Sequence, residues 1–294
     1  MTNIPSAPPP EDQPSPHDSP ALRAETEELR ATAEQLRGQV SGLEVQARTR
    51  PRIAMAEGVL VERYRLENAE AAFALLRQAS QRANIKLHQM AAAVARTPGP
   101  APGAKSWFGG RPHQPAPDLT TLEAGTLDPA NQGEILGAAL QRVLNITGAH
   151  MGNVQLIEDG VLRMARHTGL PRQFTDFFAF VEGKTSCSRA AVASQQVTVK
   201  DVALSAGFDE ETRRVILAAG SRACHSIPLI DEQDTVQGVI SSHHAGPLVG
   251  FTQAQLQSLE ATGRAVGTWV KWHRHTVVVD ALEDLHRLAR ASRP

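Results

Sequence analysis

The chain has few cysteines, few aromatic residues and no long hydrophobic run. Its 294 residues include two cysteines and one tyrosine, and aromatic residues make up 4% of the total. No stretch approaches the roughly 18 consecutive apolar residues of a membrane-spanning helix. Two cysteines without a secretory signal pattern argue against a disulfide scaffold, so we expect a protein of the reducing cytoplasm without membrane contact.

Positive and negative charges nearly balance over the whole chain. The formal net charge is −1, whereas proteins that coat nucleic acid carry a large positive excess. Any contact with nucleic acid must therefore be local. One segment fits that requirement, because residues 71–96 contain no Asp or Glu but carry Arg77, Arg82, Lys86 and Arg96.

The first 50 residues divide into two segments of different composition. Residues 1–20 are rich in proline and serine, which predicts a disordered tail. Residues 21–50 place leucine at every seventh position, at Leu22, Leu29, Leu36 and Leu43. This spacing predicts a coiled coil and favours a parallel homodimer. A lone helix that folds back onto its own chain is the alternative.

Residues 51–96 carry three short helical patterns. Pro51 should begin or kink the first helix, because its ring removes a backbone donor. Asn68 should cap the second helix, and Asn84 should end it and cap the third. The expected core includes Ala56, Leu60, Tyr64, Phe73, Leu76, Ile85, Met90 and Val94. Three short helices make a compact bundle that is too small to enclose a substrate.

Three sequence motifs are spaced along the three helices of this bundle. They are Ala56-Glu57-Gly58-x-Leu60, Glu70-Ala71-x-Phe73 and Asn84-x-Lys86-Leu87. Residues 51–96 thereby resemble the ANTAR family of RNA-binding antitermination domains. The resemblance implies binding to nascent RNA at paired short stem-loops, which prevents a terminator hairpin from forming. Members of the family usually have a sensory domain beside the RNA-binding one.

The second helix of the bundle carries a polar face opposite its apolar arc. We expect this face, together with the cap of the third helix, to contact RNA. The candidate RNA-binding residues are Arg77, Gln78, Ser80, Gln81, Arg82, Asn84 and Lys86. Cationic and amide side chains suit contact with phosphates and with splayed loop bases. An ordinary solvated face would have the same composition, so the resemblance supplies much of this assignment.

A linker and a second domain follow the bundle. Residues 97–118 are rich in proline and glycine, which predicts a linker. Trp107 and Phe108 within it could dock on either domain or be exposed. From residue 119 the pattern is helix, hairpin, helices, strand, helix, hairpin and helix. We expect Glu158-Asp159-Gly160 to form a hairpin turn and a long helix to run from Gln253 to about Arg290.

Three motifs of the second domain are Asn153-x-Gln155-Leu156, Ser186-Cys187-Ser188 and Gly238-Val239-Ile240-Ser241. With the order of elements, they make residues 119–275 resemble the GAF family of sensory domains, followed by a helical extension at 276–294. The resemblance implies an antiparallel sheet flanked by helices. GAF pockets hold cyclic nucleotides, haem, bilins, small metabolites or nothing. No cofactor is therefore assigned, and a small-molecule ligand is one partner that the domain could take.

The cysteines and histidines of the second domain are candidates for redox or metal chemistry. Cys187 should lie near a helix N-terminus, where a thiol pKa can be lowered, and Cys224 should be a small buried hydrophobe within a strand. His225, His243 and His244 lie on two strands that we expect to be neighbours. Adjacent His243 and His244 must point to opposite faces, and no ligand motif frames them. We therefore favour ordinary hydrogen-bonded histidines over a metal site.

Nothing in the sequence indicates an enzyme. The GAF-type free methionine sulfoxide reductases depend on a constellation of cysteines, which two cysteines do not reproduce. The combined expectation is an α+β multidomain protein, with a coiled coil and a three-helix bundle before the sheet domain. We expect a dimeric, signal-responsive RNA-binding regulator of transcription antitermination. The alternative is a ligand-binding or scaffold protein whose bundle mediates protein contacts only.

Overall fold

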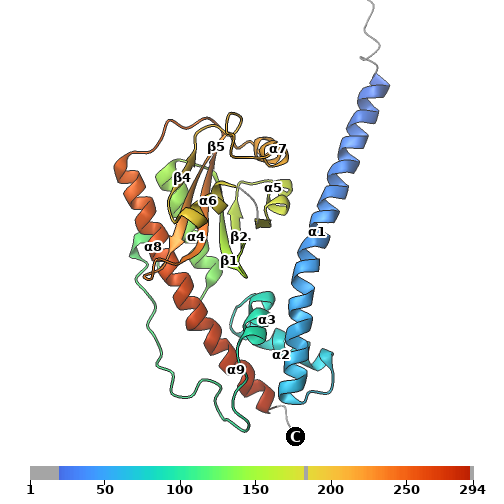
Figure 1. Cartoon of the computed structure of the whole chain (residues 1–294), viewed down its shortest axis with the longest axis vertical. Coiled ribbons are helices and arrows are strands. Elements are labelled where there is room, and N and C mark those ends of the chain that lie inside the picture. Colours follow the sequence, from blue (N-terminus) through green and yellow to red (C-terminus); the bar gives the residue numbers. More distant parts are fainter. Residues whose placement is uncertain (1–19, 182–184, 292–294) are drawn as a thin grey trace, which may run out of the picture.

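The computed structural model describes residues 20–181 and 185–291. The tail expected at the N-terminus lies outside the described residues, apart from Pro20. Among the described residues, no helix combines the length and the apolar character needed to cross a lipid bilayer. The chain forms two bodies, a helical bundle and a sheet domain, which the C-terminal helices connect (Figure 1).

The N-terminal element α1 (Pro20–Tyr64) is one continuous helix of 45 residues. Pro51 lies inside it, so no new helix begins at Pro51, and the other alternative, that Pro51 kinks the helix, stays a prediction. Both Pro51 and Ala47, whose carbonyl loses its usual donor, are exposed, and water can serve that carbonyl instead. The N-terminal half of α1 extends away from the rest of the chain (Figure 1).

Two short helices complete the bundle, α2 (Ala69–Arg82) and α3 (Leu87–Arg96). Asn68 caps α2 as expected, because its Oδ1 accepts a hydrogen bond of 2.9 Å from the Ala71 amide. Asn84 has a φ of +52° and ends α2 in the left-handed conformation that asparagine tolerates. It does not cap α3, since Lys86 occupies the cap position without a side-chain bond.

The bundle contains a fourth helix, α9 (Val277–Ala291), from the far end of the chain. Its residues Ala281, Leu282 and Leu285 are at most 2% exposed and belong to the same apolar cluster as Leu60 and Leu76. Burial of this apolar surface is what holds α9 to the bundle. Phe73, which was expected in the core, is instead 36% exposed at its edge.

The predicted linker is docked on this four-helix unit. Trp107 is 9% exposed, and its backbone amide donates a hydrogen bond of 2.8 Å to the Glu283 carboxylate on α9. The guanidinium of Arg63 lies 4.7 Å from the centre of the Trp107 ring. The question that the sequence left open is thus answered, because Trp107 docks on the bundle.

The second body is built on a six-stranded antiparallel sheet in the order β3-β2-β1-β6-β5-β4. The two predicted hairpins are present as β1–β2 and β5–β6. The strands are β1 (Met151–Glu158), β2 (Val161–Thr168), β3 (Phe180–Val181), β4 (Val197–Val199), β5 (Ala223–Ile230) and β6 (Val236–His244).

Helices cover both faces of the sheet and make two separate cores. On one face, α4 (Gln132–Thr147) and α8 (Gln253–His275) enclose a cluster that contains Trp269. On the other face, the cluster contains Phe174 and Cys224. The helices of this second face are α5 (Arg172–Phe177), α6 (Ser186–Ala193) and α7 (Glu210–Ala218). The α+β organisation predicted from the sequence is confirmed.

The expected single C-terminal helix is divided. Helix α8 ends at His275, α9 begins at Val277, and Thr276 between them has φ −118° and ψ −68°. The division has a physical reason, because α8 packs on the sheet through its apolar face whereas α9 packs on the bundle. The break at Thr276 lies where the packing surface changes from the sheet to the bundle.

Candidate nucleic-acid interface

Helix α2 presents a polar face to solvent. Arg77, Gln78 and Gln81 are exposed, whereas Leu76 and Ala79 on the opposite side are fully buried. The only acidic residue of the helix is Glu70 in its first turn. The three exposed side chains therefore form a surface of one cation and two amides, which we call the α2 face.

Ser80 does not belong to that surface. It is 6% exposed, and its hydroxyl donates a hydrogen bond of 2.6 Å to the carbonyl of Ile85. Ser80 was predicted to contact RNA from the polar side of α2, but its hydroxyl is enclosed and already bonded to the turn that follows the helix.

The remaining predicted residues lie beyond the α2 face. Asn84 is exposed in the turn. Arg82 forms a 2.9 Å ion pair with Asp284 of α9, although half of its side chain stays exposed. The Lys86 ammonium donates to the carbonyl of Ala165 on β2 at 3.4 Å. Two of the predicted cations are thus engaged by other parts of the chain.

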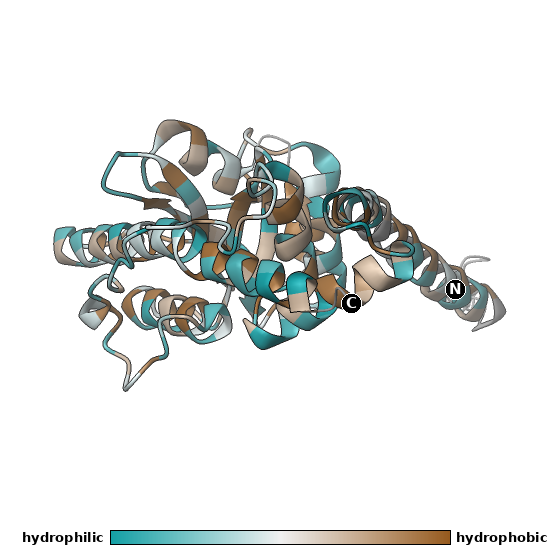
Figure 2. Cartoon of the chain, turned by 90° about the horizontal axis from the view of Figure 1, so that it is seen from below, coloured by the Kyte–Doolittle hydropathy of each residue, from teal (hydrophilic) through white to brown (hydrophobic). Residues whose placement is uncertain are grey.

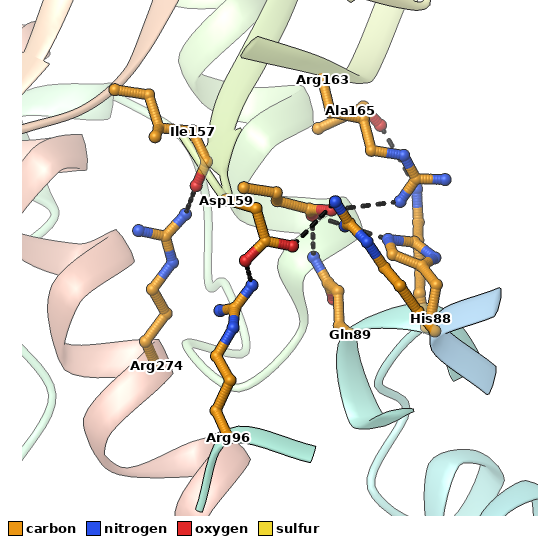
Figure 3. Close-up of polar contacts among 11 residues, drawn as sticks. His88, Gln89, Arg96, Ile157, Asp159, Arg163, Ala165 and Arg274 are labelled. Atoms are coloured by element: carbon orange, nitrogen blue, oxygen red, sulfur yellow. Dashed lines mark hydrogen bonds and ion pairs between the residues drawn. The ribbon is translucent and has the colours of Figure 1, made fainter. Parts of the chain in front are cut away.

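A network of charges joins the bundle to the β1–β2 turn of the sheet domain (Figure 3). The Asp159 carboxylate pairs with Arg52 of α1 at 2.7 Å and also with Arg96 of α3. Glu158 accepts a hydrogen bond of 3.2 Å from Gln89 of α3. These contacts were not expected from the sequence, because the residues are far apart along the chain.

His88 and Lys86, which lie at this network, both have lowered pKa values. Burial lowers the pKa of His88 to about 4, and the opposing attraction of Glu158 is smaller. Burial also lowers the pKa of Lys86, and repulsion from Arg163 lowers it further. His88 is therefore neutral at pH 7, and its Nε2 lies 3.5 Å from the Glu158 carboxylate.

The sheet face beneath α6 carries a buried cluster of hydroxyls and thiols. The Cys187 sulfur lies 3.1 Å from the Ser241 hydroxyl, and the Cys224 sulfur lies 3.3 Å from the Ser186 hydroxyl. Burial raises the pKa of Cys187 and raises that of Cys224 to about 12. The expectation of a lowered Cys187 pKa was wrong, because burial outweighs the hydrogen bonds from Ser241, Ser226 and Ser186 that lower it.

The histidines of β5 and β6 are hydrogen bonded within the sheet domain. The His243 ring contacts the Ser221 hydroxyl through Nδ1 and the side-chain oxygen Oδ1 of Asn153 through Nε2, both at 3.0 Å. His225 contacts the Thr198 hydroxyl at 2.8 Å. Within the part of the chain that the structure describes, no group of three His, Cys, Asp or Glu residues is arranged to hold a metal ion.

Polar atoms without partners also occur on the α6 side of the sheet. The Gln155 amide donates to the carbonyl of Phe178 at 3.0 Å, but its buried oxygen has no hydrogen-bond partner. The Nε and Nη2 atoms of Arg189 on α6 are also buried without a partner. Such atoms cost free energy unless another molecule satisfies them. The motif analysis did not single out Arg189.

Solved structures match about half of this chain at low identity and with low TM-scores. The GAF domain/HD domain protein from Geobacter sulfurreducens is 15% identical with a TM-score of 0.40, over 48% of this chain and 92% of that one. The GAF domain from an Acinetobacter phosphoenolpyruvate-protein phosphotransferase is 12% identical with a TM-score of 0.41, over 53% and 89%. Free methionine-R-sulfoxide reductase from Neisseria meningitidis is 15% identical with a TM-score of 0.35, over 52% and 95%.

Two family models match separate segments of the chain. The ANTAR domain model matches residues 41–94, and the GAF domain model matches residues 132–268. No curated protein matches the chain. Both resemblances drawn from the motifs are confirmed: residues 41–94 form an ANTAR domain, and residues 132–268 form a GAF domain.

Proposed function

We propose that this protein is a signal-responsive RNA-binding regulator that acts in transcription antitermination. Its ANTAR domain binds stem-loops of nascent RNA, and its GAF domain senses a small molecule or a protein partner. The observation that carries the proposal is the α2 face, where Arg77, Gln78 and Gln81 are exposed on an ANTAR helix with a single acidic residue.

The chemistry of the α2 face suits an RNA loop. The Arg77 guanidinium attracts phosphates, and the amides of Gln78 and Gln81 can both donate and accept hydrogen bonds to unpaired bases. Because the whole chain has a net charge of −1, general attraction to nucleic acid is weak. Binding therefore depends on these few side chains, which favours a specific site.

A dimer would present two ANTAR domains to paired stem-loops. In the described part of α1, Leu22, Leu29, Leu36 and Leu43 are 49–64% exposed. Hydrophobic and hydrophilic residues both lie along the helix beside the N label (Figure 2). Leucines at seven-residue spacing on a solvent-exposed helix support a parallel coiled coil with a second copy.

The C-terminal helices provide a route from the sensor to the bundle. Helix α8 packs on the sheet of the GAF domain, and α9 packs in the core of the ANTAR bundle. A small molecule with polar groups could satisfy Gln155 and Arg189 on the α6 side of the sheet. A shift of α8 on the sheet would then move α9 within the bundle.

The test is binding of the full-length protein to a labelled RNA that carries two short stem-loops, measured at several salt concentrations. Replacing Arg77 with Gln should weaken binding and reduce the slope of log affinity against log salt by about one. Arg214→Gln is the matched control, since Arg214 is a 63% exposed arginine on α7 and should have no effect.

Equal binding by wild type and Arg77→Gln would remove the α2 face as the RNA site. Sequencing of RNA crosslinked to the protein in cells tests the proposal without a chosen probe. Recovery of stem-loop leader segments supports it. A crosslinked pool with no enriched RNA would overturn it and would favour the alternative, in which the bundle mediates protein contacts only.

A further inference from the structure

Cations from the ANTAR bundle converge on the β1–β2 turn of the GAF domain. Arg52 of α1 and Arg96 of α3 both pair with the Asp159 carboxylate, the first at 2.7 Å. Lys86 lies close enough for Glu158 to raise its pKa, and it donates to the carbonyl of Ala165. We call Arg52, Lys86 and Arg96 the α1–α3 cation surface.

The cations around the turn outnumber its carboxylates. Glu158 and Asp159 carry the negative charge, whereas Arg163 of β2 and Arg274 of α8 add to the three cations of the α1–α3 surface. These cations repel one another, and repulsion from Arg163 lowers the pKa of Lys86. The seam between the domains is therefore positively charged and would attract an anion with more charge than two carboxylates carry.

The geometry around Asp159 matches that of a backbone phosphate. One anionic group is held between two guanidinium groups that approach from different helices (Figure 3). Arginine recognises carboxylate and phosphate with the same fork of N–H donors. The neighbouring Gln89 amide, which donates to Glu158 at 3.2 Å, could donate equally well to a phosphate or to a ribose hydroxyl.

The contact with the turn is weak enough to be displaced. The side chains of Arg52, Arg96 and Asp159 are 31%, 56% and 36% exposed. Ion pairs with that much solvent contact contribute little to stability, because water screens them. A polyanion that releases counterions on binding can compete with them, because each neutralised phosphate adds to its affinity.

The bundle can leave the turn without opening a hydrophobic core. The apolar cluster that includes α9 contains residues of the bundle and the linker, and the described members of the two GAF clusters are separate from it. Besides the linker, the chain passes between the two domains at Thr276, where the helix is interrupted and where the buried threonine hydroxyl has no hydrogen-bond partner. Rotation at this position would carry α9 and the bundle away together.

We propose that the α1–α3 cation surface is a second RNA phosphate-binding surface, which the Glu158–Asp159 turn covers as an internal mimic of the RNA backbone. This inference rests on the proposed function and extends it, because Arg52 and Arg96 lie outside the α2 face. The turn and the RNA compete for the same cations. The closed molecule therefore binds RNA through the α2 face alone, and the open molecule binds through both surfaces.

The experiment removes the charges of the turn in the full-length protein. Glu158→Gln keeps the shape of the side chain, and Asp159→Asn suits the left-handed backbone at φ +55°. Binding of the RNA with two stem-loops is measured at several salt concentrations. Because the closed molecule still binds through the α2 face, opening a molecule that is about 90% closed should raise the apparent affinity by at most about tenfold. The salt dependence should also become steeper.

A matched double variant controls for the change in net charge. Glu232→Gln with Asp234→Asn makes the same replacements in the β5–β6 turn, where Asp234 also has a positive φ of +57°. In the wild type, the Glu232 carboxylate pairs with Lys271 and the Asp234 carboxylate pairs with Arg264. Both cations belong to α8 and not to the bundle. This variant should bind RNA as the wild type does. Arg52→Gln added to the Glu158→Gln, Asp159→Asn variant should reverse part of its gain.

Hydrogen exchange supplies a readout that does not need RNA. Amides of residues 157–161 should exchange faster in the Glu158→Gln, Asp159→Asn variant than in the wild type, and RNA should have the same effect on the wild type. If the turn exchanges faster but RNA affinity does not rise, the competition is overturned while the α2 face stands. If neither protein binds RNA, both proposals fail. Should the double variant misfold, Asp159→Asn alone gives the same comparison.

Discussion

Tyr64 and His286 are 222 positions apart in the sequence and share a buried hydrogen bond of 2.9 Å. The other ring nitrogen of His286 lies 3.1 Å from the carbonyl of Ala104, which can only accept. Nε2 therefore carries the proton, and Nδ1 accepts from the Tyr64 hydroxyl. These two bonds of His286 thus connect α9 with the end of α1 and with the linker.

Removing the hydroxyl of Tyr64 should loosen α9. The Tyr64→Phe variant keeps the ring but leaves His286 Nδ1 buried without a donor. We expect the free energy of unfolding to fall by about 1–3 kcal/mol, measured by chemical denaturation. Tyr64→Phe combined with His286→Phe removes both polar partners and should cost less than the separate changes added together. Strictly additive losses would show that the bond contributes nothing.

Close packing of α8 on β5 depends on glycine. A Cβ atom added at Gly267 would lie 2.4 Å from the backbone of Ile230, so the helix would have to move. We expect Gly267→Ala to destabilise the protein by about 1–3 kcal/mol, measured by thermal or chemical unfolding. In α1, a Cβ at Gly58 meets nothing within 4 Å. Gly58→Ala should stabilise by up to about 1 kcal/mol, and equal losses in both variants would contradict this account.

Acid should destabilise the GAF domain through His243. Burial, with a smaller contribution from His244, lowers the pKa of His243 from 6.5 to about 3. Between these two values the unfolded chain binds more protons than the folded one, so stability falls as the pH drops below 6.5. His243→Gln should be less stable at pH 7, and its deficit should shrink towards pH 5. A deficit that is constant with pH would exclude this role for His243.

Neither cysteine should react in the folded protein at neutral pH. Burial raises the pKa of Cys187, and that of Cys224 rises to about 12, so the thiolate that attacks alkylating reagents is scarce. Mass spectrometry after iodoacetamide treatment should find both thiols unmodified until denaturant is added. Rapid labelling of Cys187 in the native protein would revive the redox interpretation.

The coiled-coil prediction is tested by replacing leucines of α1. Leu29 and Leu36 are 64% and 54% exposed in the single chain, and asparagine at both positions would place polar groups in the seam of a dimer. Sedimentation should show a wild-type dimer and a weaker association of the double variant. A wild-type monomer at micromolar concentration would contradict the prediction.

The sequence alone determined the identity of the two domains and most of their local structure. The spacing of Leu60, Leu76 and Met90 indicated the core of the bundle, and all three are fully buried. Both hairpins followed from alternating apolar residues and turn residues such as Gly160. These features depend on neighbours within one or two helical turns or across one hairpin, so local patterns contain the information.

Several local expectations failed because the surrounding chain changed the outcome. Ser80 was expected on the polar side of α2, but it is buried and its hydroxyl is bonded to the turn that follows the helix. Pro51 looked like a boundary, yet α1 continues through it, and the ANTAR match at residues 41–94 spans this position. A helical wheel or a helix propensity describes one helix alone. It does not include the other elements that pack against that helix.

Only the tertiary structure decided how the two domains meet. Nothing local to α9 indicates that Leu282 and Leu285 belong to the core of a bundle near the other end of the chain. Likewise, the pairing of Arg52 and Arg96 with Asp159 joins residues that no periodicity connects. Contacts between distant segments depend on how whole elements are oriented, and that orientation follows from burying the apolar faces of all the helices together.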